Sequence, residues 1–511
     1  MKLAILARQA PLWRRWLDGL AAGRPAVLWG SLALFAAAWF GYGAITGLGK
    51  ALHNDLTEAY VWGREFQLGY NQHPPFWAWI AGLWFMVFPH TGWPFVLLAV
   101  LNSAIGLVGA WRLIGLFAGG WVRAAAVMLL LCTPFYTFKS YIYNANTIFL
   151  SLWPWTYFFF IRAIETRRPG PAAWFGVIVG LCLLSKYYAI VLILTCLGAS
   201  FAHPAWRPYY RSASPWISIG VAGALFLPHL IWAALSHAPP LEYALGITGI
   251  GAVETVTNSV AFLLEVAAFH LAVVAIVLLS RRSNSEGIRG GTALLGHRTF
   301  LAALVFLPVV FTVLFGLGLE LRIAGKMVVG VFALLPLWLL RTIPAVNARR
   351  ACTLAACAAV GTAAIAVLAA PGISLYSFTA SRRDPAYLLP QQALAEAATR
   401  LWHSETNAPL RFVGGSKYIG NAVAFYSADQ PSGFVFLSFR EAPWVTPQAL
   451  HRDGLLTVCV PHDPACFVHA GWVSDPDVRH TVLVLKHTFW GHERAAVPID
   501  VFISPPHPEP R

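Results

Sequence analysis

Residues 54–80, NDLTEAYVWGREFQLGYNQHPPFWAWI, concentrate polar and aromatic side chains of the kinds that carry chemistry. Asp55 and Glu58 stand three residues apart, so a helix over 55–68 would place both carboxylates on one side. A carboxylate that is partly removed from water becomes more basic, which suits a general base. The same spacing is typical of a helix start, with Asn54 or Asp55 as the cap and Glu58 completing the capping pattern. Both interpretations stay open from these residues alone.

Aromatic residues accompany the two acids. Aromatic rings stack on sugar faces, and they also anchor proteins at membrane interfaces. His73 precedes two prolines that hold the backbone extended, so it would either bind a phosphate or close the turn. The candidate sugar or acceptor contacts in this stretch and in the next loop on the same side are Tyr60, Trp62, Tyr70, Tyr141, Tyr143 and Asn144.

The chain that must position these residues is strongly apolar. Of its 511 residues, 58% are hydrophobic and 11% are charged, whereas a soluble domain has about 25% charged residues. The composition therefore predicts an integral membrane protein. Segment 75–89 is short and bounded by prolines, which favours an interfacial or re-entrant helix over a span. Eleven other segments suit membrane spans: 25–47, 93–117, 121–139, 146–162, 171–187, 188–203, 214–235, 257–280, 299–319, 325–342 and 351–371.

The basic residues predict how these spans are oriented. With eleven spans, nineteen Lys and Arg residues fall on the side of the N-terminus. The opposite side of the membrane domain holds six. Such a bias predicts a cytoplasmic N-terminus, and an odd span number then places the C-terminus outside. The net charge of +14 is explained by contact with anionic membrane lipids, and no basic soluble face suggests nucleic acid as a partner.

The character of the chain changes after Pro371. We expect a transmembrane domain over 1–371, with its first outer loop at 48–92, and a soluble outer α/β domain over 372–511. Cys459 and Cys466 bracket a short turn in this second domain, where an oxidising compartment would permit a disulfide. No cluster has metal-ligand spacing, so no metal site is predicted. The strands of the outer domain are expected at 411–415, 433–439, 455–460, 481–486 and 499–504, with helices near 385–403 and 417–427.

The stretch DLTEAYVWGREFQLGYNQHPPFWAWI, placed just after a first span, resembles the signature loop of dolichyl-phosphate-mannose protein mannosyltransferase-like membrane proteins. These are glycosyltransferase family 39 and its bacterial relatives, including the aminoarabinose and galacturonic acid transferases of lipid A. LLSKYYA at 183–189 and GSKYIGNAVAFYSADQPS at 415–432 are similar to further segments of such proteins. Many members carry adjacent Asp and Glu before Ala-Tyr, whereas Thr57 precedes Glu58 here. This departure leaves open which carboxylate is the base. Asp55 is the first choice, because related bacterial loops also space Asp and Glu three residues apart, and Glu58 is the second.

The resemblance implies a type C glycosyltransferase fold in a bacterial inner membrane, with a periplasmic C-terminal domain. The implied donor is a polyprenyl-phosphate sugar, and the implied acceptor is a lipid or another envelope molecule, with inversion at the anomeric carbon. No cofactor is implied, and the need for a divalent metal is left open. A transporter or flippase of lipid-linked sugars is the alternative, although no pair of broken helices in repeated halves is visible.

A leaving phosphate requires positive charge at the outer ends of the spans. Cations are in the minority on that face, and charges at a membrane boundary are costly enough to suggest a function. The alternative is that these cations extend their side chains to lipid head groups. Glu320 offers Arg322 a plausible ion-pair partner, which weakens its candidacy. The candidate donor-phosphate residues are Lys186, Lys326, Arg322 and His73.

Overall fold

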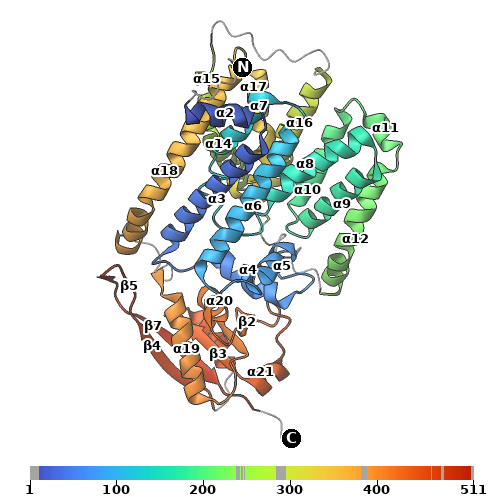
Figure 1. Cartoon of the computed structure of the whole chain (residues 1–511). Helices are drawn as coiled ribbons and strands as arrows, with labels where there is room; N and C mark the ends of the chain where they lie inside the picture. Colours follow the sequence, from blue (N-terminus) through green and yellow to red (C-terminus); the bar gives the residue numbers. More distant parts are fainter. Residues whose placement is uncertain are drawn as a thin grey trace.

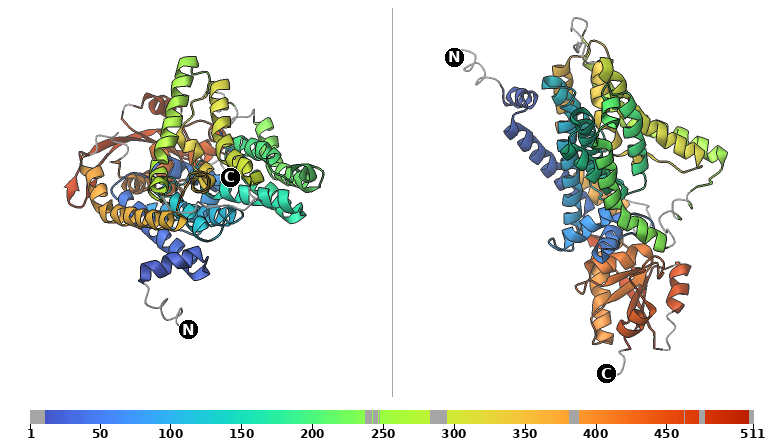
Figure 2. Two further views of the ribbon diagram at one scale, coloured as in Figure 1. Left: turned by 90° about the horizontal axis from the view of Figure 1, so that it is seen from above. Right: turned by 90° about the vertical axis from the view of Figure 1, so that its right-hand side faces the viewer.

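The computed structural model describes residues 11–236, 248–282, 295–380, 388–461, 463–472 and 477–507, together with Glu242 and Gly246. Residues 1–10 and 283–294, which carry some of the basic residues counted on the expected cytoplasmic side, lie outside the described residues. The chain forms a helical bundle with a sheet domain at one end, and its N-terminus lies at the other end (Figure 1). Figure 2 shows the same two-part arrangement from the side.

The bundle is built largely from apolar helices. Six of its described helices, α3, α6, α12, α14, α16 and α18, are long and apolar enough to cross a membrane. The predicted fold, a helical membrane domain followed by a C-terminal α/β domain, is confirmed, while the span number stays a prediction. The elements of this part are α2 (Leu12–Ala21), α3 (Pro25–Gly47), α4 (Asn54–Glu65), α5 (Phe76–Phe85), α6 (Gly92–Ile114), α7 (Gly120–Leu130), α8 (Phe149–Thr166), α9 (Pro169–Leu183), α10 (Ala189–Phe201), α11 (Trp206–Tyr210), α12 (Ser214–Leu235), α14 (Ala252–Phe269), α15 (Leu271–Leu279), α16 (Leu295–Gly318), η2 (Gly325–Val328), η3 (Val331–Leu334), α17 (Leu335–Thr342) and α18 (Ala348–Ala380).

Three predicted spans are not continuous helices. In 121–139, α7 ends at Leu130 and turns follow, in keeping with Pro134, which lacks an N–H group and disfavours helix before it. In 257–280 the helix breaks at His270, between α14 and α15. The segment 325–342 begins as two 3₁₀ turns, and only its last part, α17, is an α-helix. Hydrophobic length alone does not reveal such interruptions.

The predicted domain boundary at residue 371 falls inside a helix. The expected span ended at residue 371, whereas α18 continues past Pro371 to Ala380. This last part of α18 is tied to the end of α3, since the Ser374 hydroxyl donates to the Leu48 carbonyl at 2.7 Å. The C-terminal domain therefore begins after Ala380.

The C-terminal domain has a five-stranded sheet in the order β2-β1-β3-β7-β4. β2, β1 and β3 are parallel, and β7 runs antiparallel to β3 and β4. Every residue of β3 is buried, as its continuous apolar sequence requires. All five predicted strands are present, and Cys459 and Cys466 form a disulfide. The elements are α19 (Gln391–Glu405), β1 (Phe412–Gly415), α20 (Lys417–Tyr426), β2 (Ser432–Val435), α21 (Pro447–Asp453), β3 (Leu455–Cys459), α22 (Pro464–Trp472), β4 (Arg479–Leu485), β5 (Thr488–Phe489), β6 (His492–Glu493) and β7 (Val497–Ser504).

Candidate functional site

The helices α4 and α5 lie where the bundle meets the C-terminal domain (Figure 1). They cross at glycines: a Cβ added to Gly63 would lie 2.0 Å from the Ala78 carbonyl oxygen, and one on Gly82 would lie 2.3 Å from the Gly63 carbonyl oxygen. Only glycine permits so close an approach of two backbones. Segment 75–89 thus forms a short helix packed on α4, in agreement with the expectation of a short, non-spanning helix.

α4 also contacts the C-terminal domain. The Ser432 hydroxyl donates to the Glu65 carboxylate at 2.8 Å, and Arg64 donates to the Pro431 carbonyl at 3.0 Å. Gly433 lies against Val61, since an added Cβ would come within 2.6 Å of the valine side chain. α4 is therefore held between α5 and the strand β2.

Asp55 occupies the first turn of α4 and is half-buried. Its Oδ2 accepts a hydrogen bond from the Asn144 side-chain amide at 2.8 Å. The Asn144 Oδ1 in turn accepts from the backbone N–H groups of Asn146 and Thr147, both at 2.9 Å. Because two backbone donors hold the amide oxygen, the amide nitrogen must face the carboxylate. The cap of α4 is His53, whose Nδ1 accepts from the Asp55 backbone N–H at 3.3 Å, so the expected cap at Asn54 or Asp55 was wrong.

Lys186 lies in the turn between α9 and α10, close to Asp55. Its ammonium donates to the Asn146 Oδ1 at 2.7 Å. Burial lowers the pKa of Lys186 to about 8; the Lys326 cation acts in the same direction and Asp55 acts against it. Lys186 is therefore near enough to Asp55 and to Lys326 to sense the charge of each. One loop contacts both Asp55 and Lys186, because Asn144 binds the carboxylate and Asn146 binds the ammonium.

Lys326 lies in η2 and is exposed. Side chains of α14 hold the backbone around it: the Glu265 carboxylate accepts from the Gly325 N–H at 2.8 Å, and the Asn258 Oδ1 accepts from the Ile323 N–H at 2.7 Å. Glu265 also pairs with Lys139 at 3.5 Å. Glu265 thus fixes the turn that carries Lys326.

Arg322 is held by a different acid from the one expected. It forms an ion pair with Glu254 on α14. The Glu320 carboxylate instead accepts from the backbone N–H of Gly251 at 3.2 Å. The predicted Glu320–Arg322 pair was wrong, because the Glu320 carboxylate binds the Gly251 backbone and Glu254 pairs with Arg322 instead. Arg322 consequently belongs to the set of contacts that fastens this segment to α14.

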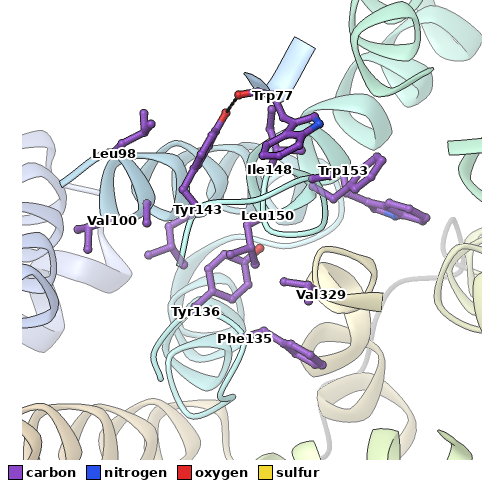
Figure 3. Close-up of a cluster of buried hydrophobic side chains, with 14 of the residues drawn as sticks. Trp77, Leu98, Val100, Phe135, Tyr136, Tyr143, Ile148, Leu150, Trp153 and Val329 are labelled. Carbon is purple, nitrogen blue, oxygen red and sulfur yellow. Dashed lines mark hydrogen bonds between the residues drawn. The ribbon is translucent and has the colours of Figure 1, made fainter. Parts of the chain in front are cut away.

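Four of the six predicted sugar or acceptor contacts are buried. Trp62 and Tyr70 stack at 5.0 Å between ring centroids, and Tyr60 packs edge-on against Phe425 of the C-terminal domain. The Tyr143 hydroxyl donates to the Trp77 carbonyl at 3.0 Å (Figure 3). These four rings are at most 3% exposed, which favours a role in packing α4, α5 and the C-terminal domain together.

The remaining predicted residues have varied surroundings. Tyr141 is half-buried beside Tyr42, and Asn144 binds Asp55 as described above. The carbonyl of His73 accepts from the Tyr70 N–H at 3.1 Å, and its ring lies against Trp77. His73 thus closes the turn through its backbone. Glu58 is buried, at 6% exposed, whereas Asp55 is only half-buried.

One connection was missed from the sequence. His229 of α12 is fully buried, and its Nδ1 donates to the Leu68 carbonyl at 2.7 Å, because a carbonyl can only accept. Its Nε2 is then left to accept from the Tyr187 hydroxyl at 2.8 Å. The first loop is thereby joined to the turn that holds Lys186. A histidine inside an apolar span was the signal that was available.

Comparisons with known proteins agree with this architecture. Residues 72–232 match the sequence family of the dolichyl-phosphate-mannose-protein mannosyltransferases. The structure of ArnT from Cupriavidus metallidurans bound to undecaprenyl phosphate is similar, with a TM-score of 0.57 and 12% identity over 93% of this chain and 98% of ArnT. The apo structure of ArnT gives 0.57 and 14% identity over 92% and 98%. A search of curated protein sequences finds no match.

The sequence match and the structural match differ in how much of the chain they cover. The matched family segment begins after Asp55, so the sequence match does not include that carboxylate. The structural likeness spans nearly the whole chain, and at such low identity it establishes the fold. The resemblance expected from the first loop is confirmed: this chain has the fold of ArnT, and its residues 72–232 match the mannosyltransferase family.

Proposed function

We propose that this protein is a membrane glycosyltransferase that moves a sugar from a polyprenyl-phosphate donor to an acceptor in the cell envelope. Asp55 takes the proton of the acceptor hydroxyl, and the acceptor oxygen attacks the anomeric carbon with inversion. The bond from that carbon to the phosphate oxygen breaks, and polyprenyl phosphate leaves. Lys186 and Lys326 offset the negative charge that develops on the phosphate.

The observation that carries this proposal is the pair of contacts made by one loop. Asn144 orients the Asp55 carboxylate and Asn146 orients the Lys186 ammonium, so a base and a phosphate-binding cation are held on one support. A transferase needs both groups within reach of a single substrate, because the acceptor and the leaving group lie on opposite sides of one carbon. ArnT, which has the same fold, has been crystallised with undecaprenyl phosphate, and this supports a polyprenyl-linked donor here.

Placement supports the choice between the two acids. Asp55 is half-buried and lies near Lys186, while Glu58 is buried. A base must reach the proton that it removes, which requires access to substrate. We therefore assign Asp55 as the base. The acceptor would approach on the side of the C-terminal domain, which we place in the periplasm, and the N-terminus in the cytoplasm.

The test uses the full chain in vesicles supplied with undecaprenyl-phosphate sugars and lipid acceptors, with products read by mass spectrometry. Asp55→Asn should lower kcat by about 10²–10⁴-fold, the usual contribution of a general base. Thermal unfolding should show that the variant folds. Glu58→Gln is the matched control and should keep more activity. Full activity of Asp55→Asn would remove Asp55 as base, and movement of the donor across the bilayer without sugar transfer would identify a flippase.

A further inference from the structure

The first half of α3 is less buried in the bundle than its second half. In the second half, Phe35, Trp39, Gly43 and Thr46 are buried, whereas none of the residues 25–34 is. This first half lies at the end of the bundle opposite the C-terminal domain (Figure 1). It is therefore remote from Asp55 and Lys186, and the space beside it belongs to a different site.

Two apolar cavities adjoin this half of α3. One, of 380 Å³, lies between α3, α6 and α7 and is lined by apolar side chains such as Leu28, Leu107 and Val127. The other, also of 380 Å³, lies between α3, α7 and α18. The cavities share Ser31, Phe35, Met128 and Leu131. Each volume is in the range of about 300–1,000 Å³ that binding sites for small molecules occupy.

Two arginines line the end of the first cavity that lies farthest from the C-terminal domain. Arg123 is held in place by its Nε, which donates to the Trp111 carbonyl at 2.9 Å, and by the Trp111 ring 4.0 Å below its guanidinium. Gly115 leaves room for this group, since a Cβ there would lie 2.7 Å from the guanidinium carbon. Arg112, which is exposed, lies near enough to act on Arg123 electrostatically. None of the described residues that line this cavity is acidic.

We propose that this site binds an anionic phospholipid, with its phosphate on Arg112 and Arg123 and an acyl chain in the first cavity. The atoms that line an empty cavity lose van der Waals contacts on that side. An acyl chain is an apolar group that a bilayer supplies and that would restore these contacts. Two neighbouring arginines in a cavity whose described lining holds no acid favour an anionic partner, and basic pockets between membrane helices suit anionic head groups. The adjoining cavity has room for a second chain of the same lipid.

The charge of the head group decides which lipid fits. Phosphatidylglycerol brings a phosphate with no cation of its own, so its charge complements the two arginines. Phosphatidylcholine carries a quaternary ammonium that would lie near them and offset the attraction. The site therefore discriminates by head group, whereas the general annulus of lipid around the bundle does not.

The experiment is native mass spectrometry of the full chain in mild detergent with phosphatidylglycerol or phosphatidylcholine. We expect one phosphatidylglycerol to be retained. Arg112→Gln should weaken its retention about tenfold, through loss of a charge-assisted hydrogen bond. Val108→Trp, which fills the first cavity without changing charge, should also expel the lipid. Arg168→Gln removes an exposed arginine outside the cavity and should retain it.

Three outcomes would overturn the proposal. Equal retention of both lipids would show that only annular contact holds them. Unchanged retention in both Arg112→Gln and Val108→Trp would exclude this cavity as the site. Displacement of phosphatidylglycerol by undecaprenyl phosphate at equal concentration would assign the cavity to the polyprenyl lipid. Thermal unfolding of each variant without added lipid separates loss of binding from loss of folding.

Discussion

Two segments far apart in the sequence bring a lysine to the same corner of the molecule, and they do so by different means. Lys186 is placed through its side chain, whose ammonium donates to Asn146. Lys326 is placed through its backbone, because Glu265 holds the N–H of the preceding Gly325 while the Lys326 side chain stays exposed. The first arrangement fixes a charge, and the second fixes a turn and leaves the charge mobile. The two lysines should therefore contribute unequally to donor binding.

The largest effect on donor binding is expected from Lys186→Ala. A charge-assisted hydrogen bond to phosphate is worth about 1.5–3 kcal/mol, so KM for a polyprenyl-phosphate donor should rise about 10–100-fold. Steady-state kinetics in vesicles would measure this, with Lys50→Ala as a control on the same face but outside the cluster. An unchanged KM would mean that Lys186 contacts lipid head groups only, and that the comparison with Lys326 has no functional basis.

The next effect is a dependence on pH. Because the pKa of Lys186 is lowered to about 8, its ammonium is charged below that pH and loses its proton as the pH rises through it. Donor binding should weaken above pH 8, by up to about tenfold per unit if the charge is required. Lys186→Arg keeps its charge at every pH in this range, so its alkaline limb should disappear. Lys326→Arg should leave the limb in place, and the reverse pattern would assign the titration to Lys326.

The smallest effects concern the second segment. Lys326→Ala should raise the donor KM about fivefold or less, because an exposed charge pair contributes about 0.2–1 kcal/mol. Glu265→Gln keeps an oxygen that can accept from the Gly325 N–H but loses the ion pair with Lys139, and a similar change in KM is expected. Glu265→Ala should do more than Glu265→Gln. An effect of Lys326→Ala as large as that of Lys186→Ala would show that exposure does not separate the two lysines.

Much of the architecture follows from local pattern. Apolar runs located helices along the whole bundle, and alternation of short apolar runs located all five main strands of the C-terminal domain. These patterns are readable because each element must bury one face against its neighbours. Helix interruptions were missed, as at His270, because a single polar residue at a break leaves the apolar run around it almost unaltered.

The site was predictable in part. Asp55, Lys186 and Lys326 stood out because charges at a membrane boundary are costly, and the structure places Lys186 within electrostatic reach of the other two. Four of the predicted sugar or acceptor contacts, Tyr60, Trp62, Tyr70 and Tyr143, are buried, and their role toward a sugar stays a prediction. A ring that binds a sugar and a ring that packs between helices are the same residue type, and only burial tells them apart.

The sequence by itself determined the class of the protein, the helical bundle, the C-terminal α/β domain and the charges worth attention, because hydrophobic length and charge are local properties. Tertiary structure alone decided which groups meet. It joined Asn144 to Asp55 across 89 residues of chain, paired Arg322 with Glu254 rather than with the nearer Glu320, and placed Glu265 under the turn of Lys326. Such contacts depend on how helices pack against one another, and spacing along one chain segment carries no record of that packing.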